Sequence, residues 1–173
     1  TILGTTDGGN VWAIQVSGTL NRGSAGSFSD TAIGTIVGEN GIIFRTTDGG
    51  AHWAIQPNST TFWFAGISFA NANMGTVAGS YGVVQRTTDG GRTWTLQTSG
   101  TRLPLYCVRF TDKLTGTVAG YKGAILRTTD GGASWNTQVS GTTADIQAMA
   151  FADANTATTV GWNGVILHTT NAG

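Results

Sequence analysis

An eight-residue motif recurs along this chain at a fixed interval, and it constrains the fold more than any other feature. The motif reads Thr-Thr-Asp-Gly-Gly-x-x-Trp and begins at Thr5, Thr46, Thr87 and Thr128. Successive copies stand 41 residues apart without insertion or deletion, and a shortened copy follows at 169–173. A repeat of about 40 to 45 residues that holds several short strands is typical of a β-propeller blade.

Each repeat has room for four short strands, and turn signals separate them. In the third copy, the residue pattern predicts strands over 105–110, 116–120, 124–128 and 134–139. A blade of this kind buries its apolar faces only against other blades. We therefore predict one all-β domain over 1–173, a β-propeller of four-stranded antiparallel blades, four per chain, with repeats near 5–45, 46–86, 87–127 and 128–168.

The two ends of the chain predict how the ring closes. Residues 1–4 resemble 165–168, so the chain is expected to begin in a third strand and to supply a fourth strand near 11–16. If the end segments 1–16 and 165–173 pair, they complete one blade and protect open strand edges. Two alternatives remain: two copies that form an eight-bladed ring, which would make the protein a homodimer, and a segment of a larger propeller.

Composition excludes several classes of partner. Nine basic and nine acidic side chains give no net charge, which argues against a nucleic-acid surface. The sequence has no apolar run long enough to cross a bilayer, and it has no cofactor or metal motif. Its single Cys107 aligns with Ala25, Gly66 and Ala148, so we expect a packed small residue. With only 10% charged residues and one Cys, we expect a secreted, surface or other extracytoplasmic location.

Variable residues gather at one end of the predicted blades. In a four-stranded meander, the turn after the second strand and the crossover to the next blade lie opposite the Thr-Thr-Asp-Gly-Gly turn. We call that end the loop face. Its segments differ from repeat to repeat, which is typical of a binding surface on a regular scaffold. The predicted binding residues are Phe62, Trp63, Tyr81, Arg102, Tyr106, Tyr121, Lys122 and Trp162, with Arg22 beside them.

Exposed aromatic side chains suit sugar rings or the side chains of a peptide. For Phe62, Phe64 and Tyr106, the alternative is that the ring caps the core. Arg45, Arg86 and Arg127 recur at the end of the third strand, where they either cover a blade edge or form a second recognition surface.

The repeated acidic and Trp residues are predicted to be structural because each of the four full copies has them. They are Asp7, Trp12, Asp48, Trp53, Asp89, Trp94, Asp130 and Trp135. Glu39 and Asp145 are the acids unique to the loop face, and a closed four-bladed ring would place them on adjacent blades. A glycosidase needs two carboxylates about 5 to 9.5 Å apart. We predict no catalytic residue. We also predict no metal site, since neither His52 nor His168 has partner residues in the sequence pattern that would complete a metal-ligand set.

The motif at 87–94 resembles the Asp box of the bacterial neuraminidase repeat and matches it at every fixed position. The wider frame over 108–135 is similar to the repeats of the photosystem II assembly and stability factor family and its bacterial relatives. The resemblance covers essentially the whole chain and implies a propeller that acts in protein assembly. Asp boxes also occur as structural turns in sialidases, sortilin-type receptors and xyloglucan-cleaving glycosidases, so the motif alone indicates fold rather than function.

These observations favour a non-catalytic binding or scaffolding propeller that recognises a protein partner through its loop face. A carbohydrate-binding module is the alternative, and a glycoside hydrolase is the second alternative. No cofactor, nucleic acid or membrane insertion is expected.

Overall fold

The computed structural model describes residues 1–16 and 18–173 and is an all-β structure. Three antiparallel sheets have four strands each, in chain order from the inner to the outer strand. The first comprises β3 (Gly23–Phe28), β4 (Gly34–Gly38), β5 (Ile43–Thr46) and β6 (Ala54–Ile55). The second comprises β7 (Phe64–Phe69), β8 (Gly75–Gly79), β9 (Val84–Thr87) and β10 (Thr95–Gln97). The third comprises β11 (Leu105–Phe110), β12 (Gly116–Gly120), β13 (Ile125–Thr128) and β14 (Asn136–Gln138).

Two smaller sheets lie at the ends of the structure. The N-terminal hairpin pairs β1 (Ile2–Gly4) with β2 (Ala13–Gln15). The C-terminal sheet pairs β15 (Ile146–Phe151), β16 (Ala157–Gly161) and β17 (Ile166–Thr169). The predicted propeller of antiparallel four-stranded blades is confirmed. The third and fourth strands are shorter than predicted, because the Asp-box turn and the preceding short turn take up their ends.

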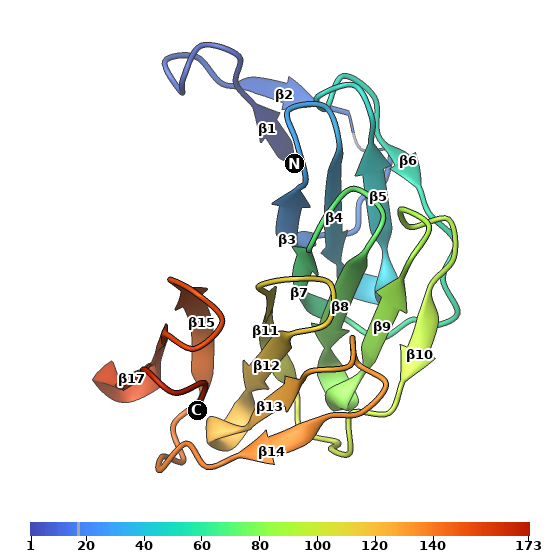
Figure 1. Cartoon of the computed structure of the whole chain (residues 1–173). Helices are drawn as coiled ribbons and strands as arrows, with labels where there is room; N and C mark the ends of the chain where they lie inside the picture. Colours follow the sequence, from blue (N-terminus) through green and yellow to red (C-terminus); the bar gives the residue numbers. More distant parts are fainter. Residues whose placement is uncertain (17) are drawn as a thin grey trace.

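The pairing expected to close a four-bladed ring is not made. Strand β2 pairs with β1, and β17 pairs only with β16 among the described residues. Figure 1 shows the reason: the sheets follow one another in an open arc, with the N-terminal hairpin and the C-terminal sheet at its two ends. Successive blades pack face to face. The rotation from each blade to the next is too small for the last blade to meet the first.

The core lies between blades rather than inside any one of them. The inner strands β3, β7, β11 and β15 are neighbours in that order. Between the first and second blades, the buried cluster includes Val37, Phe64 and Val77, none of which has exposed surface. Equivalent clusters join the second blade to the third and the third to the C-terminal sheet. Burial of these apolar faces holds the arc together.

The Asp box closes the turn between the third and fourth strands through its side chains. In the second blade, the Thr87 hydroxyl donates to Asp89 Oδ1 over 2.8 Å and accepts from the Gly91 amide over 2.8 Å. The Thr93 amide donates to Asp89 Oδ1 over 2.9 Å, and the Thr93 hydroxyl donates to Oδ2 over 2.6 Å. The turn needs a φ of +75° at Gly90, which glycine adopts without strain.

The box also directs a Trp into the core. Trp94 meets Phe69 edge to face, with ring centroids 6.2 Å apart and planes at 89°. The Phe69 ring lies over Gly75, where a Cβ would overlap it. Trp53 and Phe28, and Trp135 and Phe110, repeat this geometry. Trp12, in the N-terminal hairpin, remains 58% exposed, because no Phe of the described chain lies against it.

Candidate functional site: the loop face

Backbone hydrogen bonds connect each crossover of the loop face to the turn beside it. The Ser80 amide donates to the Trp63 carbonyl, and the Tyr121 amide donates to the Pro104 carbonyl, each over 2.9 Å. The strand before each turn ends in a glycine, because the crossover passes directly over it. At Gly79, a Cβ would overlap the Trp63 carbonyl oxygen. The backbone that carries the variable side chains is therefore fixed by the fold.

Short polar side chains hold the crossovers from inside. The buried Ser99 hydroxyl donates to the Gly82 carbonyl over 2.7 Å, and the Thr101 hydroxyl accepts from the Leu103 amide over 3.0 Å. Asn58 and Ser140 occupy the position of Ser99 in the adjacent repeats and also bond to backbone. Sequence reasoning missed these anchors, although their recurrence at the 41-residue interval was the available signal.

The turns between the second and third strands are 3-10 turns, each with a left-handed residue at its centre. These turns are η1 (Glu39–Gly41), η2 (Ser80–Gly82), η3 (Tyr121–Gly123) and η4 (Trp162–Gly164). The left-handed residue is Asn40 or Asn163 in two of them, and Asn tolerates this conformation. In the other two it is Tyr81, with φ +57°, or Lys122, with φ +53°. The conformation recurs in all four turns, so the turn itself requires it, and Tyr81 and Lys122 adopt it at a steric cost that Asn avoids.

Three of the predicted residues line one hollow of about 420 Å³ at the second blade. Phe62 enters from the crossover before β7, Tyr81 stands at the tip of η2, and Arg102 follows β10. The Phe62 and Tyr81 rings lie 5.2 Å apart at 39°. Both rings stay open to solvent, with exposures of 45% and 69%. They therefore form an accessible aromatic wall rather than a cap on the core.

A second group of predicted residues gathers around Asp145, at the third blade and the C-terminal sheet. The Lys122 amide donates to Asp145 Oδ1 over 2.9 Å, and the Lys122 ammonium lies 5.4 Å from the centre of the Tyr121 ring. Burial and the Asp145 carboxylate raise the pKa of Tyr106 above its ordinary value. Tyr106 and Tyr121 are half-buried, so they present less ring surface to a ligand than Phe62 and Tyr81 do.

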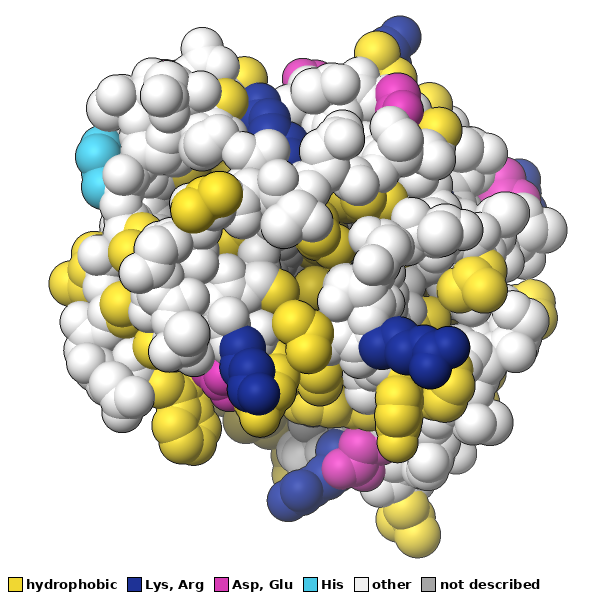
Figure 2. Space-filling view, turned by 90° about the horizontal axis from the view of Figure 1, so that it is seen from below, with side chains coloured by type: hydrophobic (Ala, Val, Ile, Leu, Met, Phe, Trp, Pro, Cys, Tyr) yellow, Lys and Arg dark blue, Asp and Glu magenta, His cyan; other side chains and the backbone are white. Residues whose placement is uncertain are grey.

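The two predicted loop-face tryptophans stand apart from each other. Trp162, at the tip of η4, is 63% exposed. Trp63 is 39% exposed, and its indole nitrogen donates to the Ser24 hydroxyl over 2.5 Å, which ties the second blade to the first. Phe64, which we expected as an alternative core cap, is fully buried. Figure 2, seen from the lower end of Figure 1, shows hydrophobic side chains on this face with Lys and Arg side chains among them.

The acids do not form a catalytic pair. Glu39 lies at the tip of the first blade, where it makes a 3.9 Å ion pair with Arg22. Asp145 precedes β15, so two complete blades lie between these acids in the open arc, and the adjacency expected of a closed four-bladed ring is not made. The box carboxylates are also engaged. Hydrogen bonds from the Thr93 side chain and amide lower the pKa of Asp89 to about 2. Among residues 1–16 and 18–173, no group of three or more His, Cys, Asp or Glu side chains could hold a metal ion.

The recurring arginines reach from one blade to the next. Arg45 Nη2 donates to the Ala72 carbonyl over 3.0 Å, and its guanidinium lies 5.6 Å from the centre of the Phe69 ring. Arg86 makes the same pair of contacts, with the Lys113 carbonyl and the Phe110 ring, and Arg127 Nη2 bonds to the next blade over 3.0 Å. The guanidinium groups therefore join neighbouring blades, which favours a structural role over a second recognition surface.

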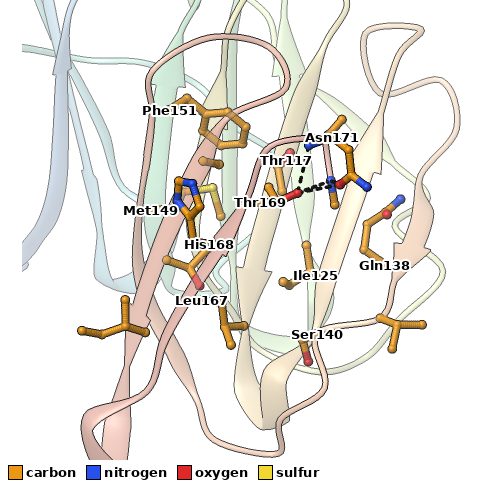
Figure 3. Close-up of a pocket in the computed structure, with 16 residues that line it drawn as sticks. Thr117, Ile125, Gln138, Ser140, Met149, Phe151, Leu167, His168, Thr169 and Asn171 are labelled. Carbon is orange, nitrogen blue, oxygen red and sulfur yellow. Dashed lines mark hydrogen bonds between the residues drawn. The ribbon is translucent and has the colours of Figure 1, made fainter.

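A groove of about 400 Å³ runs along the C-terminal sheet beside β13 and β14. Figure 3 shows Met149, Phe151 and Leu167 on one side of this groove, with Ile125 and Gln138 across from them. In the complete blades, the Trp after the Asp box packs against the residue equivalent to Phe151.

Burial raises the pKa of the nearby Cys107 thiol to about 12, so this thiol is not a reactive group.

Comparisons with known proteins connect this geometry to one family. The structure described as YCF48 bound to D1 peptide matches with a TM-score of 0.74 and 25% identity over 92% of this chain. The match spans 53% of that protein, so this chain corresponds to about half its length. YCF48 from Cyanidioschyzon merolae matches with a TM-score of 0.60 and 17% identity, over 95% of this chain and 72% of that one.

A GH74 enzyme from Niastella koreensis shares the fold, with a TM-score of 0.71 and 15% identity over 84% of this chain and 28% of the enzyme. A comparison with curated protein sequences finds no match. The family model for photosynthesis system II assembly factor YCF48 matches residues 24–153, which is most of the chain. The chain therefore belongs to the photosynthesis system II assembly factor YCF48 family.

Proposed function

We propose that this chain is a non-catalytic, assembly-factor-type propeller segment that binds a polypeptide partner through its loop face. The observation that carries the proposal is the contrast between the two ends of the blades. At the Asp-box end, Asp89 and its equivalents already accept hydrogen bonds within their own turns. At the loop end, aromatic side chains that differ from blade to blade remain exposed.

The strained residues support the same surface. Tyr81 and Lys122 occupy positions where Asn serves in the other two blades, so folding alone does not require them. Each places a large side chain on the loop face at a steric cost, as we expect where that side chain contacts a ligand. Tyr, Trp, Phe and Arg, which gather on the loop face, are also the residues enriched at protein interfaces.

The related YCF48 structure supports a polypeptide as the ligand class, since that protein is bound to a D1 peptide. We therefore propose a peptide segment of a protein partner as the ligand of this chain. An extended peptide could run across several crossovers and present side chains to each blade in turn. We also propose a location outside the cytoplasm, which the low charge and the single Cys support.

The test is fluorescence anisotropy with a labelled D1 peptide. Trp63→Ala and Trp162→Ala should each weaken binding, because each removes a large exposed ring from the loop face. Arg92→Ala is the control, since Arg92 is exposed in the Asp box at the opposite end. If Arg92→Ala weakens binding while both Trp variants bind as the wild type does, the proposed surface is wrong.

Glycan binding is the second candidate, because exposed aromatic rings also stack on sugars. A glycan array separates the two candidates: strong glycan signals together with no peptide binding would favour the carbohydrate module. Hydrolysis of a sugar polymer that disappears in Glu39→Gln or Asp145→Asn would instead indicate an enzyme. We expect neither result.

A further inference from the structure

The hollow at the second blade is built from residues that no other blade repeats. Phe62, Tyr81 and Arg102 line it. The corresponding positions in the first blade are Asn21, Asn40 and Thr61, and those in the third blade are Leu103, Lys122 and Thr143. In the first blade, the Asn40 amide donates to Asn21 over 3.1 Å and so joins those side chains to each other. The combination of two rings and a cation is therefore a local feature of one blade.

One side of this hollow is apolar and open. The Phe62 and Tyr81 rings form a tilted pair 5.2 Å apart, and Leu96, which also lines the hollow, is 63% exposed. Large apolar side chains left in water at a concave place gain free energy when an apolar ligand group covers them. This wall fits one large aliphatic or aromatic side chain.

The same hollow has a cationic side chain in its lining. Arg102 is exposed, and within the described part of the chain it makes no ion pair. Its loop is held in place, because Ser99 donates to the Gly82 carbonyl over 2.7 Å and Thr101 accepts from the Leu103 amide over 3.0 Å. A guanidinium on a fixed loop is suited to a carboxylate, with little ordering required on binding.

We infer that this hollow is a subsite for a large apolar side chain that stands next to an Asp or Glu in the bound polypeptide. The apolar side chain lies against Phe62, Tyr81 and Leu96, and the neighbouring carboxylate pairs with Arg102. This inference rests on the proposed function. It adds the chemistry of the partner segment: an acidic residue beside a bulky apolar one.

The test uses NMR titration of the isotope-labelled protein with short peptides that are acetylated and amidated, so that no terminal charge remains. Three peptides differ only at the centre: Phe-Glu, Phe-Gln and Ala-Glu. The Phe-Glu peptide should bind best. Replacing Glu by Gln should weaken it roughly fivefold, as expected for an exposed ion pair, and replacing Phe by Ala should weaken it about tenfold.

Variants assign each effect to a side chain. Arg102→Gln should reduce the affinity for the Phe-Glu peptide to that for Phe-Gln and leave Phe-Gln binding unchanged. Phe62→Ala should remove the preference for Phe over Ala. Leu103→Ala and Thr143→Ala change the corresponding positions of the third blade and should bind as the wild type does. The amide spectrum of each variant shows directly that it is folded.

The outcomes separate this inference from the proposed function. Equal binding of Phe-Glu and Phe-Gln by the wild type would overturn the assignment to Arg102. Shifts confined to amides outside 62, 81–83 and 96–102, or no binding of any of the three peptides, would overturn the subsite. In either case, D1 peptide binding that depends on Trp63 and Trp162 would leave the loop-face function standing.

Discussion

Tyr81→Asn should weaken peptide binding without weakening the fold. Tyr81 has φ +57° and ψ +25°, a conformation that costs an L-residue roughly 1 to 2 kcal/mol and that Asn adopts at lower cost. The substitution also removes the contact with the Phe62 ring, which lies 5.2 Å away. Both rings are largely exposed, so that loss is about 0.5 kcal/mol, at the low end for aromatic pairs.

The net expectation is a gain of about 0.5 to 1 kcal/mol in the free energy of unfolding, because the relief of strain exceeds the lost contact. For a domain of this size, the gain corresponds to a Tm about 1 to 4 °C higher. Urea denaturation followed by Trp fluorescence measures the free energy, and anisotropy with the labelled D1 peptide measures the affinity, which should fall.

Asn163→Tyr is the reciprocal control. Asn163 has φ +56° in the same turn, and Ala144 stands where the second blade has Phe62, so a Tyr there gains no ring contact. This variant should lose about 1 kcal/mol of stability. If Tyr81→Asn destabilises the protein by more than about 1 kcal/mol, or if it keeps full affinity, the reasoning that a strained Tyr serves binding is refuted.

Three further predictions concern the scaffold. Trp94→Ala should lower the free energy of unfolding by about 3 to 5 kcal/mol, because Trp94 is 8% exposed in the inter-blade core. Trp12→Ala should lower it by under about 1 kcal/mol, and equal losses in urea denaturation would contradict this. Arg86→Met should lower stability by about 1 to 2 kcal/mol, because the Lys113 carbonyl loses its donor and the Phe110 ring loses its cation. Arg109→Met, at an exposed site, is the control and should have little effect in thermal melts. Acid should destabilise the fold, because the folded-state pKa of Asp89 is about 2, below the ordinary 3.8. The stabilisation by this carboxylate is complete above pH 4 and is lost as the pH falls towards 2. Asp89→Asn should flatten that part of a pH series of thermal melts.

The repeat alone predicts most of the fold, because its constant residues make the same contacts in every blade. Thr87, Asp89 and Trp94 illustrate this: each contributes to a turn or core contact that the 41-residue interval reproduces. The arc was not predictable in the same way. The angle between neighbouring blades depends on how whole sheets pack, and the match between 1–4 and 165–168 contains no information about it.

The loop face was predictable as a place but not as an arrangement. Alignment of the repeats identifies Phe62, Tyr81 and Arg102 as variable residues, yet it does not indicate that they line one hollow. That depends on crossover geometry, which Ser99 and Gly79 fix through contacts with distant backbone. The left-handed conformation of Tyr81 was also missed, although the Gly that follows it and the Asn at equivalent positions were visible signals.

The most direct test of the central claim is hydrogen–deuterium exchange of the protein with and without a saturating D1 peptide. The account predicts slower exchange at the loop face, in the crossovers over 60–64 and 101–106 and in the turns η2, η3 and η4. It predicts no change in the Asp-box turns over 48–50, 89–91 and 130–132. Protection confined to the Asp-box turns would contradict it.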